Sequence, residues 1–86
     1  MRILLIYEMI PEETKFFVFE TIVAGSELYN TLLSANGHYT NLSGEEGDND
    51  ATDFLNQNLC GLRGYSVKEL PTLGAFDLVV HSGFAM

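Results

Sequence analysis

Runs of apolar residues near the start of the chain follow the pattern of strands. Residues Arg2–Ile10 and Lys15–Val23 are rich in β-branched and aromatic side chains, which favours two extended segments. Pro11 opens the short connection between them, because proline cannot donate to a strand ladder and suits a turn. The two segments therefore predict a β-hairpin. The first has the less interrupted apolar run, so we expect it in the middle of the sheet.

The apolar spacing then changes from that of a strand to that of a helix. Apolar side chains recur at i, i+4 and i+7 over Glu27–Ala35, which predicts an amphipathic helix. Ser26 is a favourable N-cap residue, and Asn36-Gly37 is a C-terminal stop because both residues tolerate a left-handed backbone. Residues 38–42 are expected to form at most a short extended segment.

The second half of the chain predicts one more helix and one more strand. Apolar residues at helical spacing predict a helix from an N-cap at Asp50 to about Cys60. Ser66–Glu69 matches a capping box, and the proline that follows leaves room for one helical turn at most. Residues Ala75–His81 form the last predicted strand, with Gly83 at its boundary.

The predicted order of elements is β-β-α-α-β. It indicates an α+β fold: a small antiparallel or mixed sheet with both helices packed on one face. The length of 86 residues fits a single domain, residues 1–86.

The composition points to a chain that folds without disulfides. Cys60 is the single cysteine, so no internal disulfide can form, which suits a reducing compartment. The first apolar run ends at Glu8 and is too short for a signal-peptide core or a membrane span, so we expect a cytoplasmic protein. The apolar fraction of 47%, with six Phe and four Tyr, is high for so small a core and suggests a homodimer.

Negative charge is concentrated in the middle of the chain. The net charge is −8, and residues 16–62 hold seven acidic residues and no Lys or Arg. Such a balance disfavours direct contact with nucleic acid or an anionic membrane and favours a partner protein with a basic surface. The densest part is the segment 45–53, whose acidic residues we predict to bind the partner: Glu45, Glu46, Asp48, Asp50 and Asp53.

Two other interpretations of this segment stay open. Acidic residues before a helix are also ordinary in a solvated loop, because they complement the positive end of the helix dipole. Asp48, Asp50 and Thr52 have the spacing of the first ligands in a calcium-binding EF-hand loop. That pattern then fails, because Asp53 stands where the loop needs glycine and Leu59 where it needs a bidentate glutamate.

No set of residues shows the spacing of a catalytic, metal or cofactor site. Asp77 and His81 share a face of one predicted strand, but their Cα atoms would be about 13 Å apart. Ser82 points to the opposite face from His81, and Cys60 reads as a buried structural thiol. Carboxylates of the hairpin that faced one another could share a proton, but solvent-facing positions are the simpler interpretation; they are Glu8, Glu12, Glu13 and Glu20. We therefore expect no enzyme, no metal and no cofactor.

Two functions remain as hypotheses. The chain resembles, in composition alone, the small acidic accessory proteins of bacteriophages, some of which inhibit bacterial defence proteins. This resemblance transfers no site residue. The acid-rich span 16–62 predicts an interaction protein whose carboxylates stand in for phosphates and so cover a basic, nucleic-acid-binding surface of a partner. The alternative is an oligomeric small-ligand-binding or sequestering protein with a pocket between subunits. Its proposed lining is aromatic and C-terminal: Tyr7, Phe17, Phe19, Tyr39 and residues 83–86.

Overall fold

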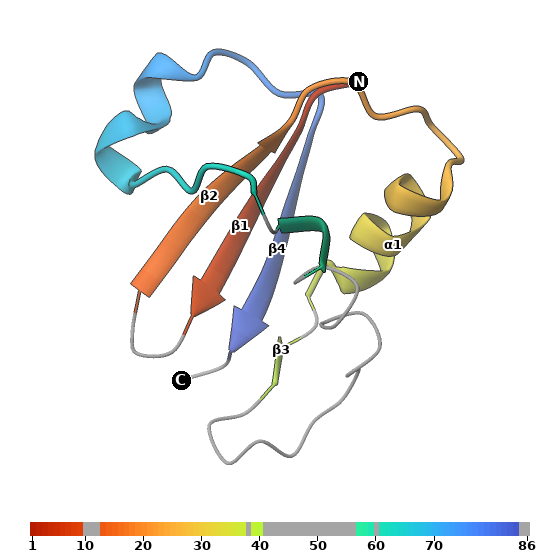
Figure 1. Ribbon diagram of the computed structural model, residues 1–86, viewed down its shortest axis with the longest axis horizontal. Coiled ribbons are helices and arrows are strands. Elements are labelled where there is room, and N and C mark those ends of the chain that lie inside the picture. The colour runs from red at the N-terminus through yellow and green to blue at the C-terminus, as the bar shows by residue number, and fades with distance from the viewer. Residues whose placement is uncertain (10–12, 38, 41–56, 60, 85–86) are drawn as a thin grey trace.

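A computed structural model describes residues 1–9, 13–37, 39–40, 57–59 and 61–84 of the chain (Figure 1). The described elements are four strands, one α-helix and one 3₁₀-helix, in addition to a helical segment at 57–59. Their bounds are β1 Ile3–Met9, β2 Glu13–Phe19, α1 Glu27–Ala35, β3 Tyr39–Thr40, η1 Val67–Thr72 and β4 Leu78–Phe84.

The strands form one mixed sheet in the order β2-β1-β4-β3. β1 and β2 pair antiparallel as a hairpin, whereas β4 runs parallel to both β1 and β3. The α+β class, the mixed sheet and the hairpin predicted from the sequence are therefore confirmed. The inner position of β1 is confirmed as well, because β2 flanks it on one side and β4 on the other.

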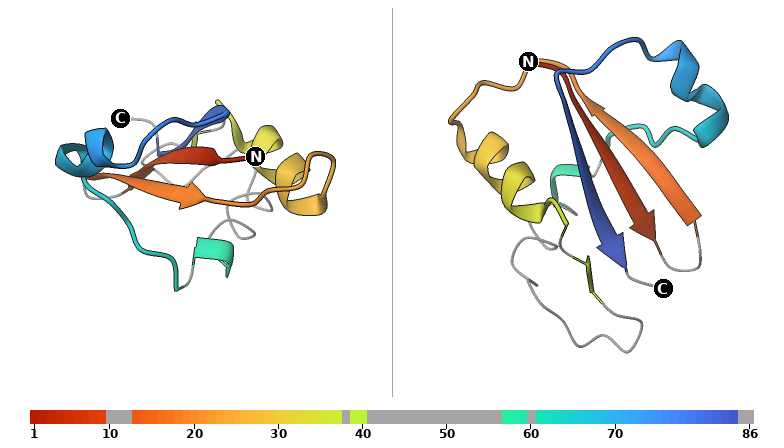
Figure 2. Two further views of the ribbon diagram at one scale, coloured as in Figure 1. Left: turned by 90° about the horizontal axis from the view of Figure 1, so that it is seen from above. Right: turned by 180° about the vertical axis from the view of Figure 1, so that it is seen from behind.

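The core lies on one face of this sheet. Because side chains alternate between the faces of a strand, Ile3, Leu5 and Tyr7 of β1 point to the same side. They are buried together with residues of β2, β4 and α1. Leu59 of the 57–59 segment packs against the same cluster, and Figure 2 (left) shows that segment on one side of the sheet. For the described part of the second helix, the prediction of two helices on one face is thus confirmed.

Helix α1 has the bounds and the N-cap that the sequence predicts. The Ser26 hydroxyl accepts a hydrogen bond from the Tyr29 backbone N–H at 3.2 Å. At the other end Gly37 has a φ of 79°, a left-handed conformation that glycine adopts without strain. The Gly37 N–H donates to the His81 carbonyl at 2.8 Å, and the Asn36 side chain accepts from the His81 N–H at 3.0 Å. The end of α1 is therefore fastened to the edge of β4.

The bounds of β2 and β4 differ from the prediction, and in each strand pairing with β1 sets the end that meets Ile3. The second strand ends at Phe19 rather than Val23, because Phe19 pairs with Ile3, the first residue of β1. The last strand spans Leu78–Phe84 rather than Ala75–His81, because Leu78 pairs with the same Ile3. Gly83, predicted as a boundary, lies inside β4.

The segment after Ser66 is longer than the single turn predicted. The predicted capping box is present, and η1 then continues through Pro71 to Thr72. Proline removes one N–H donor but its fixed φ suits a 3₁₀-helix. Hydrogen bonds from Glu69 N to Ser66 O and from Leu73 N to Leu70 O, both 3.0 Å, hold the turns on either side of it.

The second face of the sheet is more open. Figure 2 (right) shows no helix over β1 and β4 on this side among the segments drawn as ribbon. Leu4 and Phe16 are buried on this face, whereas Val79 of β4 is 48% exposed. η1 contacts β2 and borders the sheet beyond the outer edge of that strand.

Candidate functional site: a groove at the edge of β2

The five acidic residues predicted to bind a partner lie outside the described residues. Glu45, Glu46, Asp48, Asp50 and Asp53 all belong to residues 41–56, so their role stays a prediction. Cys60 and residues 48–56 of the possible calcium loop also lie outside the described residues, so both interpretations stay predictions. The candidate site is therefore built from the charged and polar groups that the structure does describe.

Three of the four Lys and Arg residues are paired with carboxylates elsewhere in the fold. Arg2 Nε lies 2.9 Å from Glu20 Oε2, and Lys15 Nζ lies 3.8 Å from Glu13 Oε1. The third pair joins Arg63 to Glu69. These cations are therefore engaged at the sheet and at η1.

Arg2 is the most connected of these cations. Besides Glu20, its guanidinium donates to the Ala75 carbonyl at 2.7 Å and lies 4.7 Å from the centre of the Phe76 ring. The hydrogen bond with Glu20 raises the pKa of Arg2 and lowers the pKa of Glu20. The backbone N–H of Arg2 also donates to the Asp77 carboxylate at 2.7 Å. Together these contacts fix the connection between η1 and β4 to the start of β1.

The outer edge of β2 meets a later part of the chain at one residue. Phe16 N–H donates to the Tyr65 carbonyl at 3.0 Å, and Tyr65 N–H donates to the Phe16 carbonyl at 2.8 Å. This is an isolated antiparallel bridge. After Tyr65 the chain turns into η1 and leaves the edge of β2.

A groove of about 560 Å³ opens beside this bridge, and we call it the edge groove. It lies between β2 and the residues that lead into η1. Its lining combines the carboxylates of Glu13 and Glu69 with hydroxyl and apolar groups. The lining residues are Glu13, Thr14, Lys15, Phe16, Gly64, Tyr65, Ser66, Val67 and Glu69.

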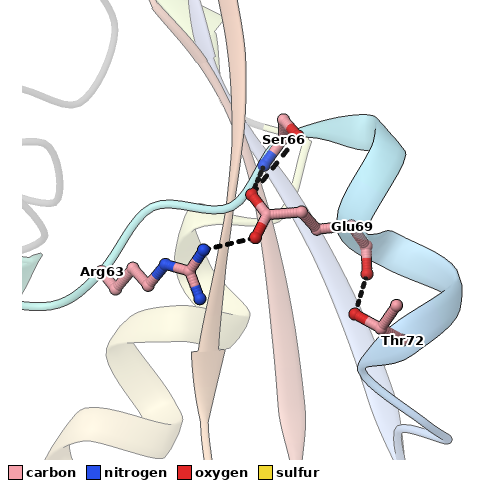
Figure 3. Close-up of polar contacts among 4 residues, drawn as sticks. All are labelled: Arg63, Ser66, Glu69 and Thr72. Carbon is pink, nitrogen blue, oxygen red and sulfur yellow. Dashed lines mark hydrogen bonds and ion pairs between the residues drawn. The ribbon is translucent and has the colours of Figure 1, made fainter.

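The wall formed by η1 is held by a compact polar network (Figure 3). Glu69 Oε1 accepts from the Ser66 backbone N–H at 3.1 Å and from the Ser66 hydroxyl at 3.3 Å, while Oε2 pairs with Arg63. The Thr72 hydroxyl donates to the Glu69 carbonyl at 2.6 Å. The hydrogen bond from the Ser66 backbone, with the charge of Arg63, holds the pKa of Glu69 below its ordinary value. Glu69 is therefore held in its ionised form, paired with Arg63, at the wall of the groove.

Arg63 also supports the Tyr65 side of the groove. Its guanidinium carbon lies 4.4 Å from the centre of the Tyr65 ring, within the range of a cation–π contact. Gly64 packs closely, because an added Cβ would lie 2.9 Å from Lys15 Cδ and 3.4 Å from the Phe17 ring. The approach of this segment to β2 thus depends on a residue without a side chain at position 64.

A second polar pair lies on the open face of the sheet. His81 Nε2 and Glu8 Oε1 are 2.7 Å apart and join the parallel strands β4 and β1. From the sequence, only Asp77 and Ser82 stood out as partners for His81, and Glu8 did not. One sequence signal pointed to this pair: Glu8 and His81 each stand near the carboxyl end of a predicted strand. Those two ends lie side by side only if the strands are parallel neighbours.

Neither Ser82 nor Asp77 joins the Glu8–His81 pair. Ser82 is buried and, by strand alternation, points to the opposite face. Asp77 precedes β4, and its carboxylate accepts a hydrogen bond from the Arg2 backbone N–H rather than pairing with His81. In the described part of the chain, no three His, Cys, Asp or Glu side chains gather as a metal site would need.

Two sequence hypotheses are changed by the packing. In the hairpin, Glu8 lies opposite Thr14 and Glu13 opposite Met9, so these carboxylates do not face one another; Glu12 is outside the described residues. The aromatic side chains expected to line a pocket between subunits are buried in the core of one chain instead. They are Tyr7, Phe17 and Phe19. They point inward because each shares the core face of its strand with Ile3 or Leu5.

No protein-family model, curated protein or solved structure matches this chain. Of the segments that the structure describes, no helix has the length and apolar character needed to cross a membrane. The candidate site therefore rests on its own geometry: a groove with two carboxylates at the edge of β2, in a chain with a large surplus of negative charge.

Proposed function

We propose that this chain is a small, non-enzymatic interaction protein that acts in the cytoplasm by offering its acidic segment 45–53 to a basic surface of a partner protein. The observation that supports this most directly is the pairing of Arg2, Lys15 and Arg63 with carboxylates outside that segment. Cations already held in ion pairs at the sheet and at η1 are less available to neutralise other acidic residues.

The numbers of acidic and basic residues support the same proposal. The sequence has twelve acidic residues and four Lys or Arg residues. Three of the acidic residues pair with Arg or Lys, and Glu8 pairs with His81. Among the residues described, Lys68 is the one base without such an ion pair. Most of the cationic side chains of the chain are thus already paired with carboxylates outside 45–53.

The partner that fits best is a protein whose own ligand is a polyanion. Carboxylates spaced along a short segment can take the place of phosphates on a basic surface, and like charges elsewhere on the chain steer the encounter. A nucleic-acid-binding protein of a bacterial defence system would be such a partner, with this chain as a phage-type inhibitor.

The oligomeric ligand-binding alternative has less support. Its lining required aromatic side chains at a subunit boundary, and three of those named are core residues of a single chain. A homodimer would have to use other surfaces, such as the open face that carries Val79.

The test is to neutralise the acidic segment and measure partner capture. The variant changes the five acidic residues of 45–53 to the corresponding amides, and the chain is used as bait in lysate of its natural host at low and high salt. We expect capture of a basic protein to fall at high salt and to fall at least about tenfold in the variant, because interactions between exposed charges are screened.

A matched control separates this segment from charge in general. Asp48→Asn with Asp50→Asn removes two charges from the segment, and Glu20→Gln with Glu27→Gln removes two outside it, one just after β2 and one in α1. The first pair should weaken capture more than the second, with circular dichroism showing both variants folded. Equal effects, or capture by the five-residue variant at the level of the unaltered chain, would rule out the acidic segment as the binding surface.

A further inference from the structure

We propose that the edge groove binds an extended peptide segment of a partner protein, which adds as a strand to the outer edge of β2. This inference rests on the proposed function, because it takes the partner to be a protein, and it deepens it by assigning a second contact site and a binding mode. The segment it fits carries an apolar side chain beside a Lys or Arg.

The backbone of β2 supplies the first argument. Phe16 uses both its N–H and its C=O to bond outward to Tyr65, away from β1. In an antiparallel strand the outward-pointing groups recur at every second residue. The N–H and C=O of Thr14 therefore point to the same side as those of Phe16. Thr14 lines the edge groove, so a donor and an acceptor of a strand edge are presented there.

The local sequence explains why the chain does not fill this edge itself. Continuing the antiparallel pairing from Tyr65 would bring Val67 opposite Thr14. Ser66 is instead the N-cap of η1, and the carboxylate of Glu69 holds the Ser66 N–H at 3.1 Å. Val67 thus turns into the 3₁₀-helix, and the groove lies at the point where the pairing stops.

The side chains of the groove indicate what the added strand would carry. Phe16 and Tyr65 form an apolar wall, and Val67 is 65% exposed beside it, which suits an apolar side chain. Glu13 and Glu69 carry the carboxylates of the lining. Lys15 pairs with Glu13 and Arg63 with Glu69, so the charges at the groove balance. The net charge of −8 on the whole chain still favours a cationic peptide over an anionic one.

The size of the groove agrees with a peptide segment. Its volume of about 560 Å³ falls within the range of roughly 300–1,000 Å³ in which proteins bind discrete ligands. Recognition by strand addition takes its affinity from main-chain hydrogen bonds and its specificity from pockets for alternate side chains. The edge groove offers both within one short stretch of β2.

The experiment selects peptides from a phage-displayed library of random peptides against the folded chain and then measures their affinity by fluorescence anisotropy. We expect selected peptides to alternate apolar and basic residues. Methylating alternate backbone nitrogens of a selected peptide, which removes the donors of one edge, should weaken binding at least about tenfold, the equivalent of one lost hydrogen bond of about 1.4 kcal/mol.

Two variants of the chain test the location. Thr14→Pro removes an N–H that points away from β1, so the hairpin ladder is kept. Val67→Lys places a positive charge on the apolar wall, which opposes both the apolar and the basic side chain of the peptide. Each should weaken the selected peptides at least about tenfold. Val23→Lys is the matched control, because Val23 is 70% exposed and does not line the groove; it should leave the affinity unchanged.

Hydrogen exchange of the Thr14 amide gives a readout that does not depend on a variant. We expect it to exchange readily in the free chain and to slow at least about tenfold when a selected peptide saturates the site. A selection that returns no binder overturns the inference, and so do binders that are indifferent to both Thr14→Pro and Val67→Lys. Protection of the Thr14 amide that rises with protein concentration alone assigns the edge to a second copy of this chain instead.

The two proposals can fail separately. If neutralising residues 45–53 abolishes partner capture while Thr14→Pro leaves it unchanged, the acidic segment stands and strand addition is lost. If selected peptides bind at Thr14 while the neutralised chain captures its partner as before, the reverse holds. A bound small molecule retained in the native mass spectrum, and lost in Val67→Lys, would assign the groove to a small ligand and overturn the peptide proposal.

Discussion

Glu8 and His81 are 73 residues apart in the sequence, yet their side chains meet at 2.7 Å across the parallel strands β1 and β4. The side chain of Glu8 is 31% exposed and that of His81 is 42% exposed. We expect the pair to stabilise the fold by about 0.5–1 kcal/mol, the upper part of the range for half-exposed ion pairs. A double-mutant cycle with Glu8→Gln and His81→Gln, followed by urea unfolding, measures this coupling. A cycle that closes to zero would show that the two side chains act independently.

The elements predicted correctly are those whose boundaries depend on nearby residues. Helix α1 has its predicted bounds because Ser26, the apolar stripe and Gly37 all act within one helix length. Strand ends depend on neighbours far away in the sequence, so β2 and β4 both differ from prediction where each meets Ile3.

The two sites that the sequence did not predict also depend on contacts between residues far apart in the chain. The Glu8–His81 pair requires β1 and β4 to be parallel neighbours, and the edge groove requires Tyr65 to return to Phe16. Neither relation leaves a local pattern. The acidic segment 45–53 is the opposite case. Its composition alone identifies it, but its residues lie outside those that the structure describes.

The pKa of Glu69 makes the stability of η1 sensitive to acid. Because the Ser66 hydrogen bond and Arg63 lower this pKa, Glu69 stabilises the fold at pH values above its unfolded-state pKa, and that contribution is lost as the pH falls through the lower folded-state pKa. We expect Glu69→Gln to lower the melting temperature by a few °C at neutral pH and by less in acid. Thermal melts followed by circular dichroism between pH 3 and pH 7 measure the difference.

Glu27 gives the control for this experiment, because it lies exposed in the first turn of α1, away from Arg63 and Ser66. Glu27→Gln should retain the acid dependence of the unaltered chain. If Glu69→Gln retained it too, the charge of Glu69 would not contribute to stability.

Adjacent leucines of α1 should respond very differently to truncation. Leu32 is fully buried against the sheet, whereas Leu33 is 40% exposed. Leu32→Ala should cost about 2–5 kcal/mol, because it leaves a cavity in the core, and Leu33→Ala less than about 1 kcal/mol. Urea unfolding compares the two. An unfolded Leu32→Ala chain beside a folded Leu33→Ala chain would agree with this, and equal losses would contradict the orientation of α1.

Of the glycines that the structure describes, Gly83 should tolerate a side chain least. Its φ is 139°, and a Cβ built on it would collide with the backbone of Glu8 in the neighbouring strand. The Glu8 atoms that it would meet are the carbonyl oxygen, the amide nitrogen and the carbonyl carbon. All three belong to the backbone of β1, and none is the movable end of a side chain. Gly83→Ala must therefore either separate the two strands or shift their register, and we expect a loss of at least about 3 kcal/mol in the free energy of unfolding.

Gly61 separates the effect of backbone conformation from that of the collision. Its φ is 89°, but a Cβ there would have no neighbouring atom within 4 Å. Gly61→Ala should thus cost only the strain of a left-handed alanine, about 1–2 kcal/mol. Urea unfolding of both variants gives the difference, which reports the close approach of β1 and β4. Losses of equal size would mean that Gly83 does not lie against Glu8. The separation of those two strands at their carboxyl ends also positions His81 for Glu8, so Gly83→Ala should abolish the coupling within that pair.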